Sequence, residues 1–235
     1  SGSVRATVED SQTEKLQNAV DLIEESGRIA DAAYYEAMME NSNKKIEYLT
    51  EARNAMQKEL DEAVESGQIE RGSNEWYEMI DQMYQMDAAI DEATLELEQF
   101  QNAINDIYWD NFDQLINRIE YLKDETESLI GLMDDKDFVD ENGNWTDEGI
   151  TALGLYAQQM EIAEYEAQQY AEAIDQLTAD YEAGLYSEDE YLEKLNELKS
   201  AQYESIEAYE EAKEAIVDMN EARIDAVKEG IQEEI

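Results

Sequence analysis

The chain contains 235 residues, 61 of them acidic and 16 basic, and it has no proline, cysteine or histidine. A net charge of −45 excludes nucleic-acid binding through a basic patch and disfavours binding to anionic membranes. Without cysteine and histidine there is no disulfide framework, no thiolate or imidazole metal ligand, and no histidine general base.

The first long segment predicts helix, because apolar residues recur three and four positions apart. We expect residues 1–7, which open with "SGS", to be a cloning remnant and flexible start, and residues 8–133 to form a long helical hairpin. The break within this hairpin falls at 65–76, "ESGQIERGSNEW". Gly67 suits the position after a helix end, and Ser73 or Asn74 suits an N-cap. The apolar positions of the first helix are Leu16, Val20, Ile23, Ile46, Leu49, Met56, Leu60 and Val64.

The second helix, roughly 73–133, shows a heptad seam with apolar residues at both the a and the d positions. At 1.5 Å per residue such a helix is about 90 Å long, so we expect an elongated molecule. Farther along, the apolar spacing shifts to a new register. The two heptad rows are Met83, Ile90, Leu97 and Ile104, and Met86, Ala93, Phe100 and Ile107; the shifted positions are Phe112, Leu115, Ile119, Leu122 and Leu129.

Residues 134–146 interrupt the helices with an acidic, amide-rich stretch, "DDKDFVDENGNWT". An EF-hand calcium loop needs oxygen ligands at positions 1, 3 and 5, glycine at 6 and glutamate at 12, and neither possible register of this stretch supplies that set. A turn fits better, with Asn142-Gly143 at positive φ and Thr146 as the N-cap of the next helix. Asp140, Asn142 and Asn144 remain weak candidates for a loosely held cation.

Residues 147–235 predict a second helical hairpin. The first helix of this hairpin ends near Gly184, and the second starts at "YSEDEY". Ser187 and Glu190 form a capping box, with Tyr186 and Tyr191 placed as a hydrophobic staple. The complete pattern predicts an all-α fold of about four long helices, arranged as elongated antiparallel helical hairpins or a coiled coil.

Neighbouring aromatic residues are the candidates for contact with a protein partner: Trp76, Tyr77, Tyr108 and Trp109. Aromatic residues at helical spacing are more often part of a core. Adjacent residues point about 100° apart, however, so one of each pair is expected to face solvent. Nothing in the sequence resembles a phosphate-binding loop or a nucleophile with its base, so we expect no enzymatic activity and no cofactor.

Two thirds of the chain resembles the tail tape-measure proteins of siphophages and prophages of Gram-positive bacteria. The resemblance lies in a series of short sequence motifs that follow one another in the same order. "EWYEM" (75–79) starts a helix that continues through "IYWDNFDQLINRIEYLKDE" (107–125). The "NGNWTDEG" turn (142–149) and a helix rich in Gln, Tyr and Ala follow, through residue 177.

The resemblance implies a structural role: an internal helical segment that helps set tail-tube length during assembly. It also implies a virion tail location after assembly in the bacterial cytoplasm, and protein partners among tail-tube or assembly proteins, or self-association. The alternative is a spectrin-like helical rod that serves as an interaction module of a bacterial surface or scaffold protein. The predicted turns at 66–73, 134–146 and 183–187 favour hairpins, which suit such a rod, whereas a linear ruler needs an extended chain.

Overall fold

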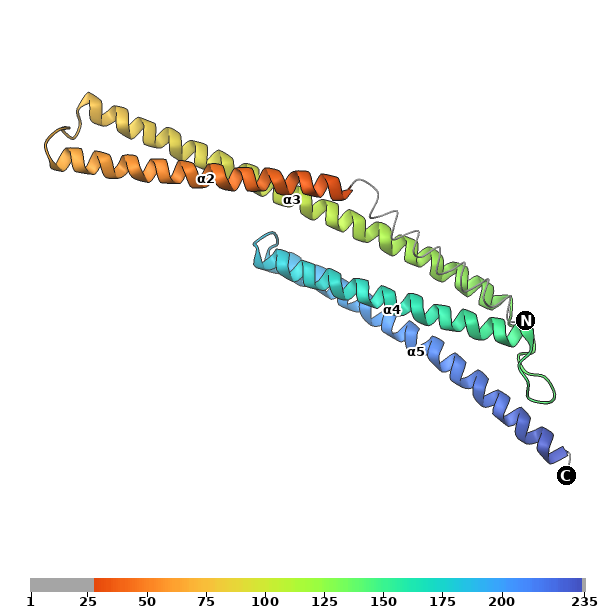
Figure 1. The fold of residues 1–235 in the computed structure, drawn as a ribbon. Coiled ribbons are helices and arrows are strands. Elements are labelled where there is room, and N and C mark those ends of the chain that lie inside the picture. Colours follow the sequence, from red (N-terminus) through yellow and green to blue (C-terminus); the bar gives the residue numbers. More distant parts are fainter. Residues whose placement is uncertain (1–27, 234–235) are drawn as a thin grey trace. The chain divides into compact units, whose positions relative to one another are not determined.

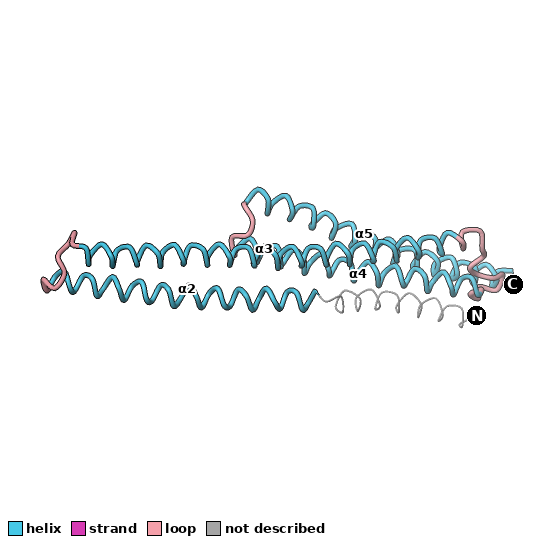
Figure 2. The backbone as a smooth tube through the Cα atoms, turned by 90° about the horizontal axis from the view of Figure 1, so that it is seen from above, coloured by secondary structure: helices cyan, strands magenta, loops and turns pink. Residues whose placement is uncertain are grey.

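The computed structural model describes residues 28–233, and within this range it contains helices and no strand (Figure 1). This confirms the predicted all-α class. The predicted start at residues 1–7, with Leu16, Val20 and Ile23, lies outside the described residues. No described helix contains the apolar stretch that crossing a bilayer requires. The helices are α2 (Arg28–Glu65), α3 (Asn74–Gly131), α4 (Asp147–Glu182) and α5 (Glu188–Glu233), joined by short loops (Figure 2).

Contacts divide the chain into two compact units, and the boundary falls inside α3, between Asp110 and Asn111. We expected residues 8–133 to form one hairpin, so this division differs from the prediction. α3 is 58 residues long, and its part beyond Asn111 packs against α4 through Ile119 and Leu122. The part of α3 up to Asp110 packs in one unit with α2, and the part from Asn111 packs in the other with α4 and α5.

In the unit of residues 26–110, α2 and the first part of α3 run antiparallel (Figure 1). Nε of Arg53 lies 3.1 Å from Oδ1 of Asp87, and the rings of Tyr35 and Phe100 pack with their centroids 6.1 Å apart. The predicted heptad positions are buried or half-buried, which confirms the seam. The buried apolar residues are Leu60, Ala63, Met83, Ala93 and Trp109.

The turn between α2 and α3 has the predicted chemistry. Gly67 has a φ of 80°, which the left-handed end of a helix favours. The backbone N–H of Trp76 donates to the Ser73 hydroxyl over 3.2 Å, so Ser73 rather than Asn74 is the N-cap.

The unit that begins at Asn111 packs three helical segments together. Ile119 and Leu122 of α3 and Ile162 of α4 form a buried cluster. α4 and α5 run antiparallel (Figure 2). They meet along small and apolar side chains, which lets the two backbones approach closely. Besides Ile162, the buried apolar residues of this pair are Ala152, Leu155, Ala163, Ala173, Leu177, Leu198, Ala212 and Met219.

The start of α5 confirms the predicted capping box. The N–H of Ser187 donates to Oε2 of Glu190 over 3.0 Å, and the N–H of Glu190 donates back to the Ser187 hydroxyl over 3.2 Å. We expected Tyr191 to pack on Tyr186. The stacked partner of Tyr191 is Tyr181 at the end of α4, with ring centroids 4.3 Å apart, so this aromatic pair closes the hairpin across the turn.

Candidate functional site

The most unusual chemistry of the described residues is a buried carboxylate in the core shared by α3, α4 and α5. Glu166 of α4 is only 2% exposed. Its Oε1 lies 3.3 Å from Nζ of Lys123 on α3, and it accepts a 2.5 Å hydrogen bond from the Ser205 hydroxyl on α5. The other carboxylate oxygen, Oε2, is buried without a hydrogen-bond partner. We name Lys123, Glu166 and Ser205 the polar cluster.

Burial dominates the electrostatics of the polar cluster. It raises the pKa of Glu166 above its ordinary value, and the hydrogen bond from Ser205 and the charge of Lys123 only partly oppose this. For Lys123, burial alone would lower the pKa. The negative charges of Glu166 and Glu120 outweigh burial, so the pKa of Lys123 is raised and the ammonium stays charged. Burial and nearby carboxylates also raise the pKa of Tyr170 to about 12.

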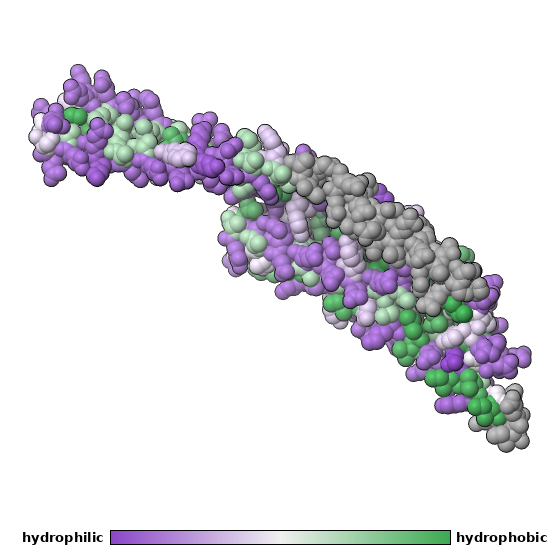
Figure 3. All heavy atoms as spheres, viewed as in Figure 1, coloured by the Kyte–Doolittle hydropathy of each residue, from purple (hydrophilic) through white to green (hydrophobic). Residues whose placement is uncertain are grey.

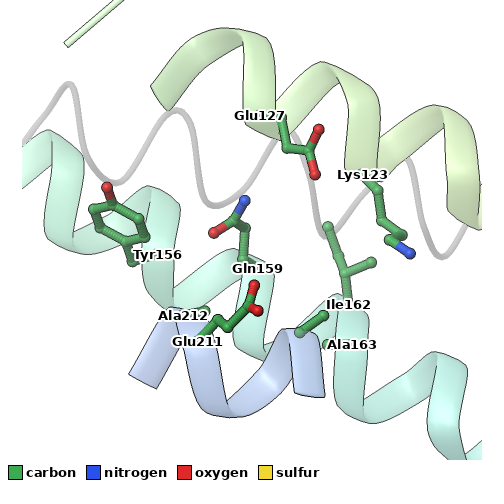
Figure 4. Close-up of a pocket in the computed structure, with 9 residues that line it drawn as sticks. Lys123, Glu127, Tyr156, Gln159, Ile162, Ala163, Glu211 and Ala212 are labelled. Carbon is green, nitrogen blue, oxygen red and sulfur yellow. The ribbon is translucent and has the colours of Figure 1, made fainter. Parts of the chain in front are cut away.

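A small cavity of about 210 Å³ lies beside the polar cluster (Figure 4). Lys123 and Glu127 reach toward it from α3, and Tyr156 and Gln159 reach toward it from α4. The size and polar lining suit several water molecules. Lys123 already pairs with Glu120 and Glu166, and no nucleophile with an adjacent base lines the cavity. Its remaining lining residues are Ile162, Ala163, Ala208, Glu211 and Ala212.

The acidic loop before α4 is a closed turn. Oδ1 of Asp140 accepts the backbone N–H groups of Asn142 and Asn144, each over 2.9 Å. These hydrogen bonds lower the pKa of the Asp140 carboxyl, and the one from Asn144 has the largest effect. Gly143 takes a φ of 82°, and the Thr146 hydroxyl accepts the N–H of Gly149 over 3.0 Å, so the predicted turn and N-cap are both confirmed.

The weak expectation of a cation at Asp140, Asn142 and Asn144 has no geometric support. Oδ1 of Asp140 already accepts two backbone hydrogen bonds that close the loop. Among residues 28–233, no three acidic side chains come together in a group that could hold a metal ion. The loop instead packs on α5: the Arg223 guanidinium lies 5.9 Å from the centre of the Trp145 ring, and a Cβ on Gly143 would collide with Val227.

The predicted partner-contact aromatics separate into exposed and buried side chains. Tyr77 is 59% exposed, while Trp76 and Tyr108 are half-buried. Trp109 is buried, and its indole N–H donates to the side-chain oxygen of Asn105 over 3.1 Å. The expectation that Trp109 offers a partner surface is therefore wrong, because its ring belongs to the core.

The polar cluster was not predicted, although the sequence carries a signal for it. Leu198, Ser205, Ala212 and Met219 recur every seven residues and are all buried, so Ser205 is a polar residue at a core position. Glu166 likewise stands seven residues before buried Ala173. Single polar residues within an apolar heptad row are the pattern that points to such a cluster.

No protein-family model matches the chain, and neither a curated protein nor a solved structure matches it.

Proposed function

We propose that the chain is a non-enzymatic structural segment of a tail tape-measure protein, which helps set the length of the tail tube while the virion tail is assembled in the host cytoplasm. The observation that carries this proposal is α3, an uninterrupted helix of 58 residues that contributes to both compact units. A helix converts residue number into length at about 1.5 Å per residue, which is the physical requirement of a ruler. The resemblance in residues 73–177 covers α3 and most of α4.

Antiparallel hairpins impose a condition on this role. In the α4–α5 hairpin the chain leaves near the end where it entered, so a closed hairpin adds almost nothing to the end-to-end distance. The ruler role therefore requires α4 and α5 to separate inside the tube. Opened into continuous helix, residues 147–233 would span about 130 Å, and the whole chain would span about 350 Å.

The test is an in-frame deletion of residues 147–233 from the parent gene, with tail length measured by electron microscopy. We expect tails shorter by about 130 Å. The matched control replaces residues 147–233 with an unrelated helical sequence of equal length, and this replacement is expected to restore the length. Tails of unchanged length, a length that the replacement does not restore, or a parent that builds no tail would contradict the proposal.

A spectrin-like rod that binds another protein is the second candidate. The observation that favours it is the number of large hydrophobic side chains that remain exposed in both units, Tyr77 and Tyr84 of α3 among them. The same deletion separates the two roles, because an interaction module would not change tail length in proportion to the residues removed.

A further inference from the structure

The exposed hydrophobic residues of α5 share one face of the helix. At about 100° per residue, all six fall within an arc of roughly 80°. Isolated hydrophobic residues on a surface are normal, but a shared face along a whole helix is the pattern of a binding surface. We name these residues the outer row; they are Leu192, Tyr203, Ile206, Val217, Ile224 and Ile231, and they are 42–63% exposed.

The outer row is separate from the face that packs in the core. The buried positions, Ala212 and Met219 among them, lie roughly 140° around the helix from Val217 and Ile224. Between the two faces stand half-buried Tyr209 and Ile216. The apolar surface of α5 is therefore much wider than the single stripe that one helical hairpin needs. Figure 3 shows apolar side chains gathered along the C-terminal part of α5.

The charged residues around the outer row indicate the charge that a binding partner should carry. Between Ile206 and Ile224 the other border of the outer row is acidic, with Glu207, Glu214, Asp218 and Asp225, whereas Lys199, Lys213 and Lys228 stand among the outer row itself. α5 as a whole has 15 acidic and five basic residues, and the chain has a net charge of −45. Two copies of such a helix would repel each other.

We infer that the outer row binds an amphipathic helix of another protein, one with lysine or arginine along one edge of its apolar stripe. Val217, Ile224 and Ile231 recur every seven residues, which is the spacing of a seam between two helices. The basic edge of the partner would meet the acidic border of the outer row. This inference holds whether or not the chain measures tail length.

The test uses the intact chain and a fluorescein-labelled synthetic peptide of four heptads, with leucine at a and d and lysine at e and g. Fluorescence anisotropy is expected to show saturable binding that weakens as salt is added. Replacing Val217, Ile224 and Ile231 together by serine leaves the charge unchanged and is expected to weaken binding about tenfold or more. These side chains are exposed, so circular dichroism should show an unchanged helix content.

Two controls make the result specific. Serine in place of Tyr34, Tyr48 and Tyr77 removes three exposed aromatic side chains in the other unit and is expected to leave peptide binding unchanged. A peptide with glutamate at e and g is expected not to bind. Equal binding by the native chain and the Val217, Ile224 and Ile231 variant would overturn the inference, because it would reduce binding to general charge attraction. Self-association of the native chain that this variant abolishes would also overturn it, since the occupant would then be a second copy.

Discussion

The two units of the chain use different solutions to the same packing problem. The seam between α2 and the first part of α3 is filled by Leu60, Ala63, Met83 and Ala93, with no buried charge among its described residues. The core of α3, α4 and α5 also contains apolar residues, but it adds Glu166 with its partners Lys123 and Ser205. A dry apolar seam supplies stability, whereas a buried polar cluster costs desolvation and is retained in some proteins to fix helix register.

The largest loss of stability is expected when an apolar residue is removed from the core of α3, α4 and α5. Such a loss would show that apolar packing, and not the polar cluster, stabilises this unit. Leu177→Ala should lower the free energy of unfolding by about 2–4 kcal/mol, because Leu177 is fully buried and the substitution leaves a cavity. Trp145 fluorescence during urea unfolding reports on this unit once Trp76 and Trp109 are replaced by phenylalanine. The exposed Leu192→Ala is the control and should change stability by less than about 0.5 kcal/mol. Equal effects of the two substitutions would contradict the packing described for α4.

Removing the two charged residues of the polar cluster one at a time tests the difference between the two cores. Lys123→Met should cost about 1–3 kcal/mol, because it leaves the buried Glu166 carboxylate with Ser205 as its one remaining partner. Glu166→Leu should change stability by less than about 1 kcal/mol or increase it. Lys123 keeps its ion pair with Glu120, and Ser205 keeps its hydrogen bond to the Ala201 carbonyl. The measurement is the urea midpoint of each variant, and a larger loss for Glu166→Leu than for Lys123→Met would contradict this asymmetry.

The stability of the unit that begins at Asn111 should depend on pH through Glu166. Because the folded-state pKa of Glu166 is raised, the folded protein holds this proton more tightly than the unfolded chain does. Its contribution to stability therefore increases as pH falls through the folded-state pKa and is complete below the unfolded value. In Glu166→Gln the titration is absent, so any stability advantage of the variant at neutral pH should shrink in mild acid. Melting temperatures of both proteins across this range check the sign, and an advantage that grows in acid would show that the pKa is lowered instead.

The smallest expected effect is that of salt on the melting temperature, and it should apply to both units. Moderate sodium chloride is expected to raise the melting temperature by a few degrees, because screening weakens the self-repulsion of a chain with a net charge of −45. Sodium sulfate is not a suitable substitute, since it also strengthens apolar burial. A melting temperature that stays level or falls from low to moderate sodium chloride would show that attractive ion pairs outweigh repulsion.

Much of the fold could be predicted from local signals. Gly67, Ser73, Thr146 and the Ser187 capping box mark helix ends through contacts that span only a few residues, so the sequence contains nearly all of the information. The boundary inside α3 could not be predicted, because it depends on which helices lie alongside, and periodicity does not identify neighbours.

The site was less predictable for the same reason. Burial of Trp109 and the meeting of Lys123, Glu166 and Ser205 are contacts between segments far apart in the chain. A polar residue in an apolar row indicates that something polar lies opposite, but not which side chain it is.

The antiparallel pairing of α4 and α5 has a mechanical consequence. Tension applied at residues 147 and 233 would pull on the open end of the hairpin and break its contacts one turn at a time toward Gly184. Tension applied at residues 147 and 188 would instead load α4 along its own axis, because the chain between these residues is α4 and the short loop that follows it. The first geometry should open at much lower force, which optical tweezers with handles at these positions can compare. A segment held in this way resists heat and denaturant through its core, yet yields readily to a pull along the chain.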